Sequence, residues 1–143
     1  MQIEYMDKTH LPEVMEIDRA CFPEPWSEKS FVDEMENDNT AYFVAKEDRV
    51  LGYAGIWCVF ENADITNIAV SPDFRRRGVG EKLLLALVTE AKIRGADNIR
   101  LEVRANNTAA IMLYEKCGFS KIGVRKKYYS DNGEDALIME RKI

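Results

Sequence analysis

Metal-binding and nucleophilic side chains are scarce in this sequence of 143 residues. His10 is the only histidine, so a histidine-rich metal site is excluded and any Ser-His or Cys-His pair would depend on that one residue. Cys21, Cys58 and Cys117 are odd in number and widely spaced, which excludes a complete disulfide framework and a C-x-x-C metal pattern. We therefore expect no metal, reduced thiols, and a general base that is a carboxylate or water.

Long apolar runs are also absent. The longest uninterrupted one, Leu83–Val88, is far shorter than the roughly 20 residues that a membrane helix requires. The first residues, MQIEYMDK, lack the apolar core of a secretory signal, and no repeat, low-complexity tract or linker occurs. We predict one domain covering residues 1–143, located in the cytoplasm and not bound to a membrane.

Charge is divided unevenly along the chain. The net charge is −5, but residues 1–64 carry 15 acidic and 5 basic side chains, a net of −10, whereas residues 65–143 carry 10 and 15, a net of +5. An acidic total gives little support to nucleic-acid binding. This uneven charge suits a basic second half that binds an anionic cofactor and an acidic first half that binds a cationic substrate. Solvated surfaces of either sign explain the same charges equally well.

The stretch from Asp64 to Gly95 organises the rest of the sequence. Its first part is an apolar, β-branched run, and Ser71-Pro72-Asp73 closes it, so a strand is predicted to end near Ser71. Apolar side chains then recur at helical spacing from Leu83 to Ala91, and Gly95 is a typical residue for the helix end.

Between this strand and helix, three consecutive arginines precede Gly78-Val79-Gly80. The positive end of the helix dipole disfavours cations by roughly 0.3–1 kcal/mol each, so local stability does not explain the arginines. Free backbone N–H groups, glycines and guanidinium groups together suit a phosphate or pyrophosphate. The pattern is neither a P-loop nor G-x-G-x-x-G, because the third glycine position is Leu83. A solvated basic turn is the alternative.

The remaining pattern, R-x-x-G-x-G after an Ile-Ala-Val strand, resembles the acetyl-CoA signature of the GCN5-related N-acetyltransferase (GNAT) superfamily. The resemblance implies acetyl-CoA as co-substrate, with its pyrophosphate on the basic turn and its pantetheine along the preceding strand. The cofactor-binding residues that it implies are Ile68, Ala69, Val70, Arg75, Arg76, Arg77, Gly78, Val79, Gly80, Glu81, Asn107 and Tyr114.

The predicted order of elements, β-α-α-β-β-β-α-β-α-β-β, matches the GNAT fold. We therefore expect an α/β (α+β) protein with a mixed, mostly antiparallel sheet of about seven strands and about four helices, in which one parallel β-α-β pair is splayed at the cofactor site. The predicted strands cover 2–6, 41–45, 50–60, a segment ending near Ser71, 98–104, 119–129 and 135–143. Helices are predicted to start at caps Thr9, Ser27 and 106–108, besides the central helix.

Three further stretches narrow the resemblance: Phe22-x-x-Pro25-Trp26-Ser27, the run from Leu101 to Tyr114, and Arg125-x-x-Tyr128-Tyr129. They are similar to the bacterial ribosomal-protein-alanine N-acetyltransferases, which modify the N-terminus of ribosomal protein S18. The similarity covers essentially the whole chain. One departure is Asn106, where serine is expected, although the neighbouring Asn107 keeps the amide that matches the family's cofactor contact.

Acetyl transfer from a thioester to an amine requires a neutral amine, stabilisation of a tetrahedral oxyanion and a proton for the leaving thiolate. The resemblance assigns the backbone N–H of Val70, freed where parallel strands part, to the acetyl oxygen. Glu102 projects from the polar face of its predicted strand and is the candidate base. Arg100 and Arg104 share that face and would weaken this base if they lie close. An exposed, charge-paired glutamate is the alternative.

Tyr114 shares a predicted helix face with Ala110 and is the candidate acid. A thiol pKa near 8.5 and a phenol pKa near 10 make this proton transfer uphill by roughly 2 kcal/mol, unless the site lowers the tyrosine pKa. A plain core tyrosine is the alternative.

The expected acceptor is a protein N-terminal α-amine, most favourably the alanine of ribosomal protein S18. Pro25, Trp26, Tyr128 and Tyr129 are the predicted substrate-binding residues, because their rings and the prolines around Trp26 suit a narrow slot for a chain end. Trp26 as a plug over the core is the alternative for that residue. A GNAT enzyme acting on lysine or a small amine, and a non-enzymatic acyl-CoA-binding module, also remain open. The sequence leaves monomer and weak dimer undecided.

Overall fold

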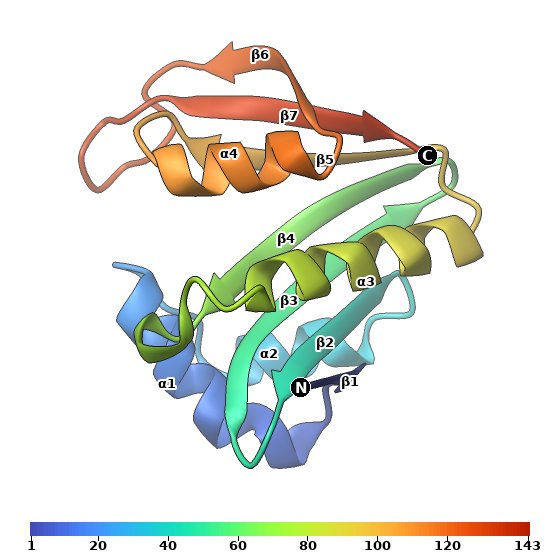
Figure 1. Ribbon diagram of the computed structural model, residues 1–143, viewed down its shortest axis with the longest axis vertical. Helices are drawn as coiled ribbons and strands as arrows, with labels where there is room; N and C mark the ends of the chain where they lie inside the picture. Colours follow the sequence, from blue (N-terminus) through green and yellow to red (C-terminus); the bar gives the residue numbers. More distant parts are fainter.

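Seven strands and four α-helices follow one another in the predicted order (Figure 1). The structure, a computed structural model, describes residues 1–143. Its elements are β1 (Gln2–Tyr5), the short 3₁₀ helix η1 (Lys8–His10), α1 (Leu11–Cys21), α2 (Glu28–Glu36), β2 (Thr40–Lys46), β3 (Val50–Val59), β4 (Asn62–Val70), the 3₁₀ helix η2 (Pro72–Phe74), α3 (Val79–Ile93), β5 (Asn98–Arg104), α4 (Thr108–Lys116), β6 (Ser120–Arg125) and β7 (Ala136–Lys142).

All seven strands belong to one sheet with the order β1-β2-β3-β4-β5-β7-β6. Every neighbouring pair is antiparallel except β4 and β5, which the crossover through α3 makes parallel. β4 and β5 lie together near the C-terminus and then diverge, so the sheet opens into two arms (Figure 1). The predicted mixed α/β class, strand number and helix number are confirmed.

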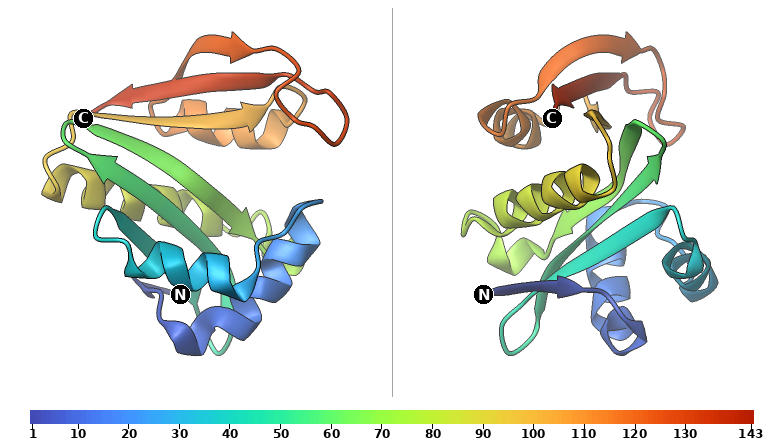
Figure 2. Two further views of the ribbon diagram at one scale, coloured as in Figure 1. Left: turned by 180° about the vertical axis from the view of Figure 1, so that it is seen from behind. Right: turned by 90° about the vertical axis from the view of Figure 1, so that its right-hand side faces the viewer.

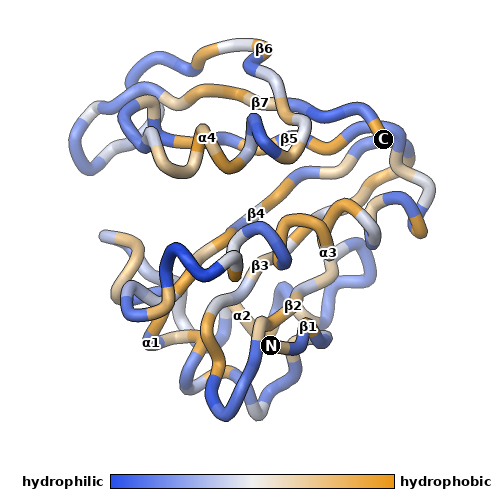
Figure 3. The backbone as a smooth tube through the Cα atoms, in the orientation of Figure 1, coloured by the Kyte–Doolittle hydropathy of each residue, from blue (hydrophilic) through white to orange (hydrophobic).

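The helices cover both faces of the sheet. α3 and α4 lie on one face and α1 and α2 on the other (Figure 2). α3 buries the apolar stripe predicted from its sequence, which includes Leu83, Leu87 and Ala91. Figure 3 shows this apolar stretch of α3 next to the hydrophilic turn that precedes it. Gly95, with φ +90°, follows the helix end as expected.

The start of α1 differs from the prediction. Thr9 does not cap this helix; Asp7 caps the preceding η1, where its carboxylate accepts the Thr9 N–H at 2.9 Å. His10 completes a capping box because its Nδ1 accepts the Asp7 N–H at 3.0 Å. The other predicted caps, Ser27 for α2 and Asn107 for α4, are confirmed.

The predicted strand 119–129 is too long. β6 ends at Arg125, and Lys127, with φ +51°, turns the chain away from the sheet. The carboxylate of Asp135 accepts the Lys127 N–H at 2.9 Å and contacts Lys126 Nζ at 3.2 Å, which fixes this turn. Tyr128 and Tyr129 therefore lie in the loop between β6 and β7 rather than in a strand.

Candidate active site

The opening between the two arms of the sheet is built by a short parallel pairing. β4 and β5 share only three residue pairs, and the last is Asp64 with Arg100. Ser71 N–H donates to Leu51 O at 2.8 Å, so the alternation of an antiparallel ladder turns the N–H of Val70 away from β3. Since β5 has diverged on that side, the N–H of Val70 faces the opening between the arms.

The basic turn before α3 presents a run of free backbone donors. No hydrogen bond within the chain uses the backbone N–H groups of residues 75–81, and no side chain caps α3. Gly78 precedes α3 with φ +78°, a conformation that favours glycine, and Arg76 has φ +64°. Successive free N–H groups at a helix start form a concave site for an anion.

The three arginines of this turn are exposed and loosely paired. Arg75 bends back over the end of β4, where its Nε lies 3.3 Å from Val70 O. Arg77 contacts Glu47 at 3.5 Å, and Arg76 forms no ion pair. Exposed pairs of this kind contribute roughly 0–1 kcal/mol, so the guanidinium groups can turn toward an anion at little cost.

The start of α3 lies against α4. A Cβ atom on Gly80 would be 3.2 Å from Leu113 Cδ2 and 3.7 Å from Val70, so α4 crosses directly beside the basic turn. Glu81 and Lys116 form an ion pair at 3.1 Å between the two helices. Asn107 uses its amide oxygen to cap α4, accepting the Ala110 N–H at 3.2 Å, while its amide nitrogen has no partner within the chain.

Glu102 lies on the sheet face opposite α3 and α4, on the side of the opening formed by β5. Arg125 of β6 contacts its carboxylate at 3.4 Å. The two neighbours that shared its predicted face have other partners: Arg100 pairs with Glu140 at 2.7 Å, and Arg104 pairs with Asp131 at 3.0 Å. Glu102 therefore meets one exposed cation from another strand rather than the two arginines of its own strand.

Two further groups surround Glu102. Its hydrogen bond with Tyr128 raises the pKa of that tyrosine, with desolvation as a smaller cause. Desolvation raises the pKa of Asp64 on β4, and the negative charge of Glu102 adds to this effect while Arg100 opposes it. Asp64 was not among the predicted site residues, although its place on the polar face of a strand leading to Val70 was a usable signal.

Tyr114 is buried in α4 with 6% of its surface exposed, and its ring packs against Phe119 at 6.0 Å. Desolvation raises the pKa of Tyr114, and the charge of a deprotonated Tyr129 would raise it further. The phenol is thus fully protonated at neutral pH, and transfer of its proton costs more than an ordinary tyrosine would require. Tyr114 thus packs as a core residue while lying near Tyr129 of the predicted acceptor wall.

The predicted aromatic wall comes from two separate loops. Trp26 packs on Phe31 at 5.2 Å and on Tyr42 at 6.5 Å, so it covers the core between α1, α2 and the sheet, as the plug alternative required. It also lines a cavity of about 330 Å³ together with Ser30, Asp33, Glu34 and Asn37. The preceding Pro25 is exposed. Tyr128 and Tyr129 form a T-shaped pair at 5.1 Å in the β6–β7 loop.

A buried polar network behind Trp26 was not predicted. Asp18, only 1% exposed, accepts the Trp26 N–H at 2.7 Å and the hydroxyl proton of Tyr53. The hydroxyl of Tyr42 bonds Thr66 Oγ1 at 2.8 Å, where β4 bulges against β3. Asp18 falls four residues after buried Val14 in α1, and this spacing was the available signal.

Two general features of the chain bear on its chemistry. No helix is both long enough and apolar enough to cross a membrane. No cluster of three or more His, Cys, Asp or Glu side chains is arranged to hold a metal ion.

Comparisons with known proteins identify the family. Residues 11–119 match the acetyltransferase (GNAT) family model. The chain is 40% identical over 143 residues to the [ribosomal protein bS18]-alanine N-acetyltransferase of Salmonella typhimurium, covering 99% of this chain and 97% of that protein.

Solved structures agree. The crystal structure of the ribosomal-protein-S18-alanine N-acetyltransferase from Escherichia coli matches with a TM-score of 0.89 and 37% identity, covering 99% of this chain and 93% of that one. A GNAT family acetyltransferase from Elizabethkingia anophelis with acetyl-CoA bound shares the fold, with a TM-score of 0.79 at 19% identity over 99% and 97% of the two chains. The chain therefore belongs to the GNAT family and is an acetyl-CoA-dependent N-acetyltransferase.

Proposed function

We propose that this enzyme transfers the acetyl group of acetyl-CoA to a protein N-terminal α-amine, and that the alanine at the N-terminus of ribosomal protein S18 is its acceptor. The observation that carries the proposal is the opening where β4 and β5 diverge, with Val70 on β4 at one side and Glu102 on β5 at the other. It is supported by the acceptor named for the Salmonella and Escherichia coli relatives, which this chain resembles over nearly its whole length.

In this proposal, the basic turn binds the pyrophosphate of acetyl-CoA. The free N–H groups of residues 75–81 and the exposed arginines are suitable donors, and the amide nitrogen of Asn107 is available to the pantetheine or its thioester side. The pantetheine follows Ile68, Ala69 and Val70, a part of β4 that no longer pairs with β5. The carbonyl oxygen of the acetyl group then accepts the N–H of Val70.

The amine attacks the thioester carbon directly, in a complex of enzyme, acetyl-CoA and acceptor. Its nitrogen forms a bond to this carbon while the carbonyl oxygen becomes an oxyanion, which the N–H of Val70 stabilises. The carbon–sulfur bond then breaks and the thiolate of CoA leaves. One proton leaves the ammonium before the attack, and a second leaves the nitrogen as the intermediate collapses to the amide. Glu102 accepts each, directly or through water, and passes it to solvent, because it is an exposed carboxylate on the β5 side of the opening.

Tyr114 supplies the proton that the thiolate needs. Its raised pKa keeps the hydroxyl protonated, so it donates a hydrogen bond to the sulfur from the start of the reaction. Proton transfer follows only as negative charge accumulates on the sulfur. The burial of Tyr114 makes hydrogen-bond stabilisation of the thiolate the larger part of this role, with complete transfer the smaller one.

An α-amine suits this set of residues better than a lysine. With a pKa near 7.7–8.0, an α-amine is roughly 10–15% neutral at pH 7, against about 0.04% for a lysine near 10.4, a difference of over 3 kcal/mol in preparing the nucleophile. Glu102 lies beside Arg125, whose Nε is 3.4 Å from its carboxylate, and next to Tyr128. A base of modest strength is sufficient for an α-amine.

The walls of the opening suit the end of a basic chain. The acidic first half of the sequence attracts a cationic acceptor, and Pro25 and Trp26 on one loop with Tyr128 and Tyr129 on the other are the proposed acceptor contacts.

Three peptides with one basic body test the proposal. The first has a free N-terminal alanine, the second is acetyl-blocked, and the third is acetyl-blocked with an added internal lysine. We expect acetylation, measured by mass spectrometry and by release of CoA, of the first peptide alone. Equal rates on the first and third peptides would reject the α-amine acceptor in favour of lysine, and no binding of acetyl-CoA in a calorimetric titration would reject the proposed cofactor site.

A further inference from the structure

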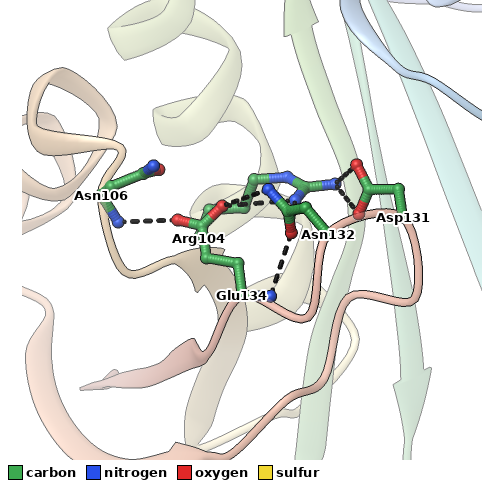
Figure 4. A network of polar contacts seen from close by, with 5 residues as sticks. All are labelled: Arg104, Asn106, Asp131, Asn132 and Glu134. Carbon is green, nitrogen blue, oxygen red and sulfur yellow. Dashed lines mark hydrogen bonds and ion pairs between the residues drawn. The ribbon is translucent and has the colours of Figure 1, made fainter.

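Arg104 is the last residue of β5, two positions beyond Glu102, and its side chain reaches into the β6–β7 loop. Its Nη2 contacts both carboxylate oxygens of Asp131 at 3.0 and 3.1 Å (Figure 4). Its Nη1 contacts Glu134 at 3.3 Å and Asn132 at 3.4 Å. One guanidinium group thus meets three residues of a loop that has no regular secondary structure.

The same guanidinium group also stacks on an aromatic ring of that loop. Its central carbon lies 4.0 Å from the ring centroid of Tyr129, which is a close cation–π contact. The arginine side chain is 26% exposed and Glu134 only 13%, so this contact is partly shielded from water. Partial shielding makes both the ion pairs and the stacking stronger than those of a fully exposed arginine.

The network continues from the loop to α4. Glu134 uses its second carboxylate oxygen to accept the N–H of Asn106 at 3.0 Å, and the oxygen of Asn132 accepts the N–H of Glu134 at 2.9 Å (Figure 4). Asn106 immediately precedes Asn107, the cap of α4. The end of β5, the β6–β7 loop and the start of α4 are therefore joined around Arg104.

The loop also lies near the proposed acid and base. The carboxylate of Glu102 is near enough to raise the pKa of Tyr128, and Tyr129 is near enough to contribute to the raised pKa of Tyr114, whose larger cause is desolvation. The hydrogen bonds of the loop backbone, Tyr129 N–H to Glu134 O at 3.1 Å and Gly133 N–H to Tyr129 O at 2.7 Å, stay within the loop. Asp135 fixes the two ends of the loop and Glu134 ties it to the Asn106 N–H, while Arg104 is the residue of the enzyme body that contacts Tyr129, Asp131, Asn132 and Glu134 together.

We propose that Arg104 is a positioning residue for the acceptor, which orders the β6–β7 loop so that Tyr128 and Tyr129 form a wall beside Glu102 before the acceptor arrives. This inference rests on the proposed function. Arg104 touches no reacting atom in this scheme; it acts through Tyr129, Asp131 and Glu134. A preformed wall avoids the conformational entropy cost of ordering the loop on binding, so loss of Arg104 weakens acceptor binding first.

Lysine cannot replace arginine here. The planar guanidinium group of Arg104 contacts the carboxylates of Asp131 and Glu134 and the ring of Tyr129 at the same time. An ammonium group is a point charge and can satisfy only one of these partners well. Arg104→Lys keeps the positive charge but loses the fork and the stacking. It therefore separates the effect of charge from the effect of geometry.

The test compares Arg104→Gln and Arg104→Lys with Arg100→Gln. Arg100 lies on the same strand and the same sheet face, pairs with Glu140 at 2.7 Å and contacts no residue of the loop, so it is the matched control. Hydrogen exchange measures the order of the loop through the amides of Lys127, Tyr129, Gly133 and Glu134. Steady-state kinetics with the free-alanine peptide and calorimetry with acetyl-CoA measure function.

We expect Arg104→Gln to increase exchange of these amides and the KM for peptide about tenfold or more, with kcat and acetyl-CoA affinity changed less than about threefold. Arg104→Lys should fall between Arg104→Gln and the wild type, and Arg100→Gln should match the wild type. Equal exchange in all variants, or a loosened loop with an unchanged KM for peptide, would overturn the positioning role. A wild-type enzyme that acetylates no peptide would overturn the proposed function instead, while the exchange data would still decide whether Arg104 orders the loop.

Discussion

Removal of the Asp18 carboxylate should destabilise this enzyme more than removal of any surface carboxylate. Asp18 is 1% exposed and accepts two hydrogen bonds, from the Trp26 N–H at 2.7 Å and from the hydroxyl of Tyr53. A hydrogen bond to a charged acceptor contributes roughly 1.5–3 kcal/mol, and Asp18→Ala leaves both donors buried without a partner. The expected loss is roughly 3–5 kcal/mol in the free energy of unfolding.

The size of the enzyme converts this loss into a melting temperature. An unfolding entropy of roughly 2.1 cal/mol/K per residue gives about 0.3 kcal/mol/K for 143 residues. Asp18→Ala should therefore lower the Tm by roughly 10–17 °C. Asp18→Asn should cost roughly 1–2 kcal/mol, because the amide oxygen still accepts the Trp26 N–H and the amide nitrogen can donate to the oxygen of Tyr53.

Urea and thermal denaturation measure these differences. Asp33→Ala is the control, because Asp33 is 60% exposed and pairs only with Lys29 at 3.0 Å, so it should change the stability by less than about 0.5 kcal/mol. The denaturant slopes should remain similar in all variants. A loss below about 1 kcal/mol for Asp18→Ala, or an equal loss for Asp18→Asn, would refute the hydrogen-bond account of this site.

Three further predictions concern catalysis, cofactor binding and pH. Glu102→Gln should lower kcat by roughly 10²-fold at pH 7. Steady-state kinetics should show this deficit shrinking several-fold by pH 9, where an α-amine is mostly neutral. A deficit in kcat that does not depend on pH would contradict the role of Glu102 as base. Gly78→Asp should weaken acetyl-CoA at least tenfold in calorimetry, whereas Gly95→Asp, which also has positive φ and open space but lies at the other end of α3, should not. Burial raises the pKa most strongly for three tyrosines, Tyr42, Tyr53 and Tyr114. Absorbance titration should show these three resisting ionisation near pH 11, and stability should fall as the pH rises above about 10, because only the unfolded chain ionises freely there. Complete ionisation of the folded protein at pH 11 would contradict this.

The order of elements and the position of the cofactor turn were predictable because local signals coincide with tertiary ones. Strand 98–104 was predicted with its observed ends, since its apolar and charged residues alternate strictly. Gly95 and Gly118 ended helices as expected, and both have the positive φ that glycine adopts most easily. In each case, one short stretch contained the signal for its own structure.

Errors arose where a residue distant in the sequence decided the outcome. The predicted strand 119–129 continued too far because its residues have strand character, but Asp135 takes the Lys127 N–H and turns the chain. The sequence also left open whether Arg100 and Arg104 pair with Glu102; both bind other carboxylates, Glu140 of β7 and Asp131 of the β6–β7 loop. Side chains on one strand face share a direction, but cross-strand neighbours determine their partners.

The two helices on one sheet face pack closely against each other beside the opening. α3 covers the arm that contains β4, α4 covers the arm that contains β5, and the two helices meet at Gly80 and Leu113. A Cβ atom on Gly80 would come within 3.2 Å of Leu113 Cδ2, so even alanine would require the Leu113 side chain to move by a few tenths of an ångström. The absence of a side chain at residue 80 thus lets α3 and α4 approach closely and leaves the backbone N–H groups at the start of α3 accessible. Gly80 of the phosphate-binding pattern therefore has a packing role as well, because it lies where α3 meets Leu113 of α4 and Val70 of β4.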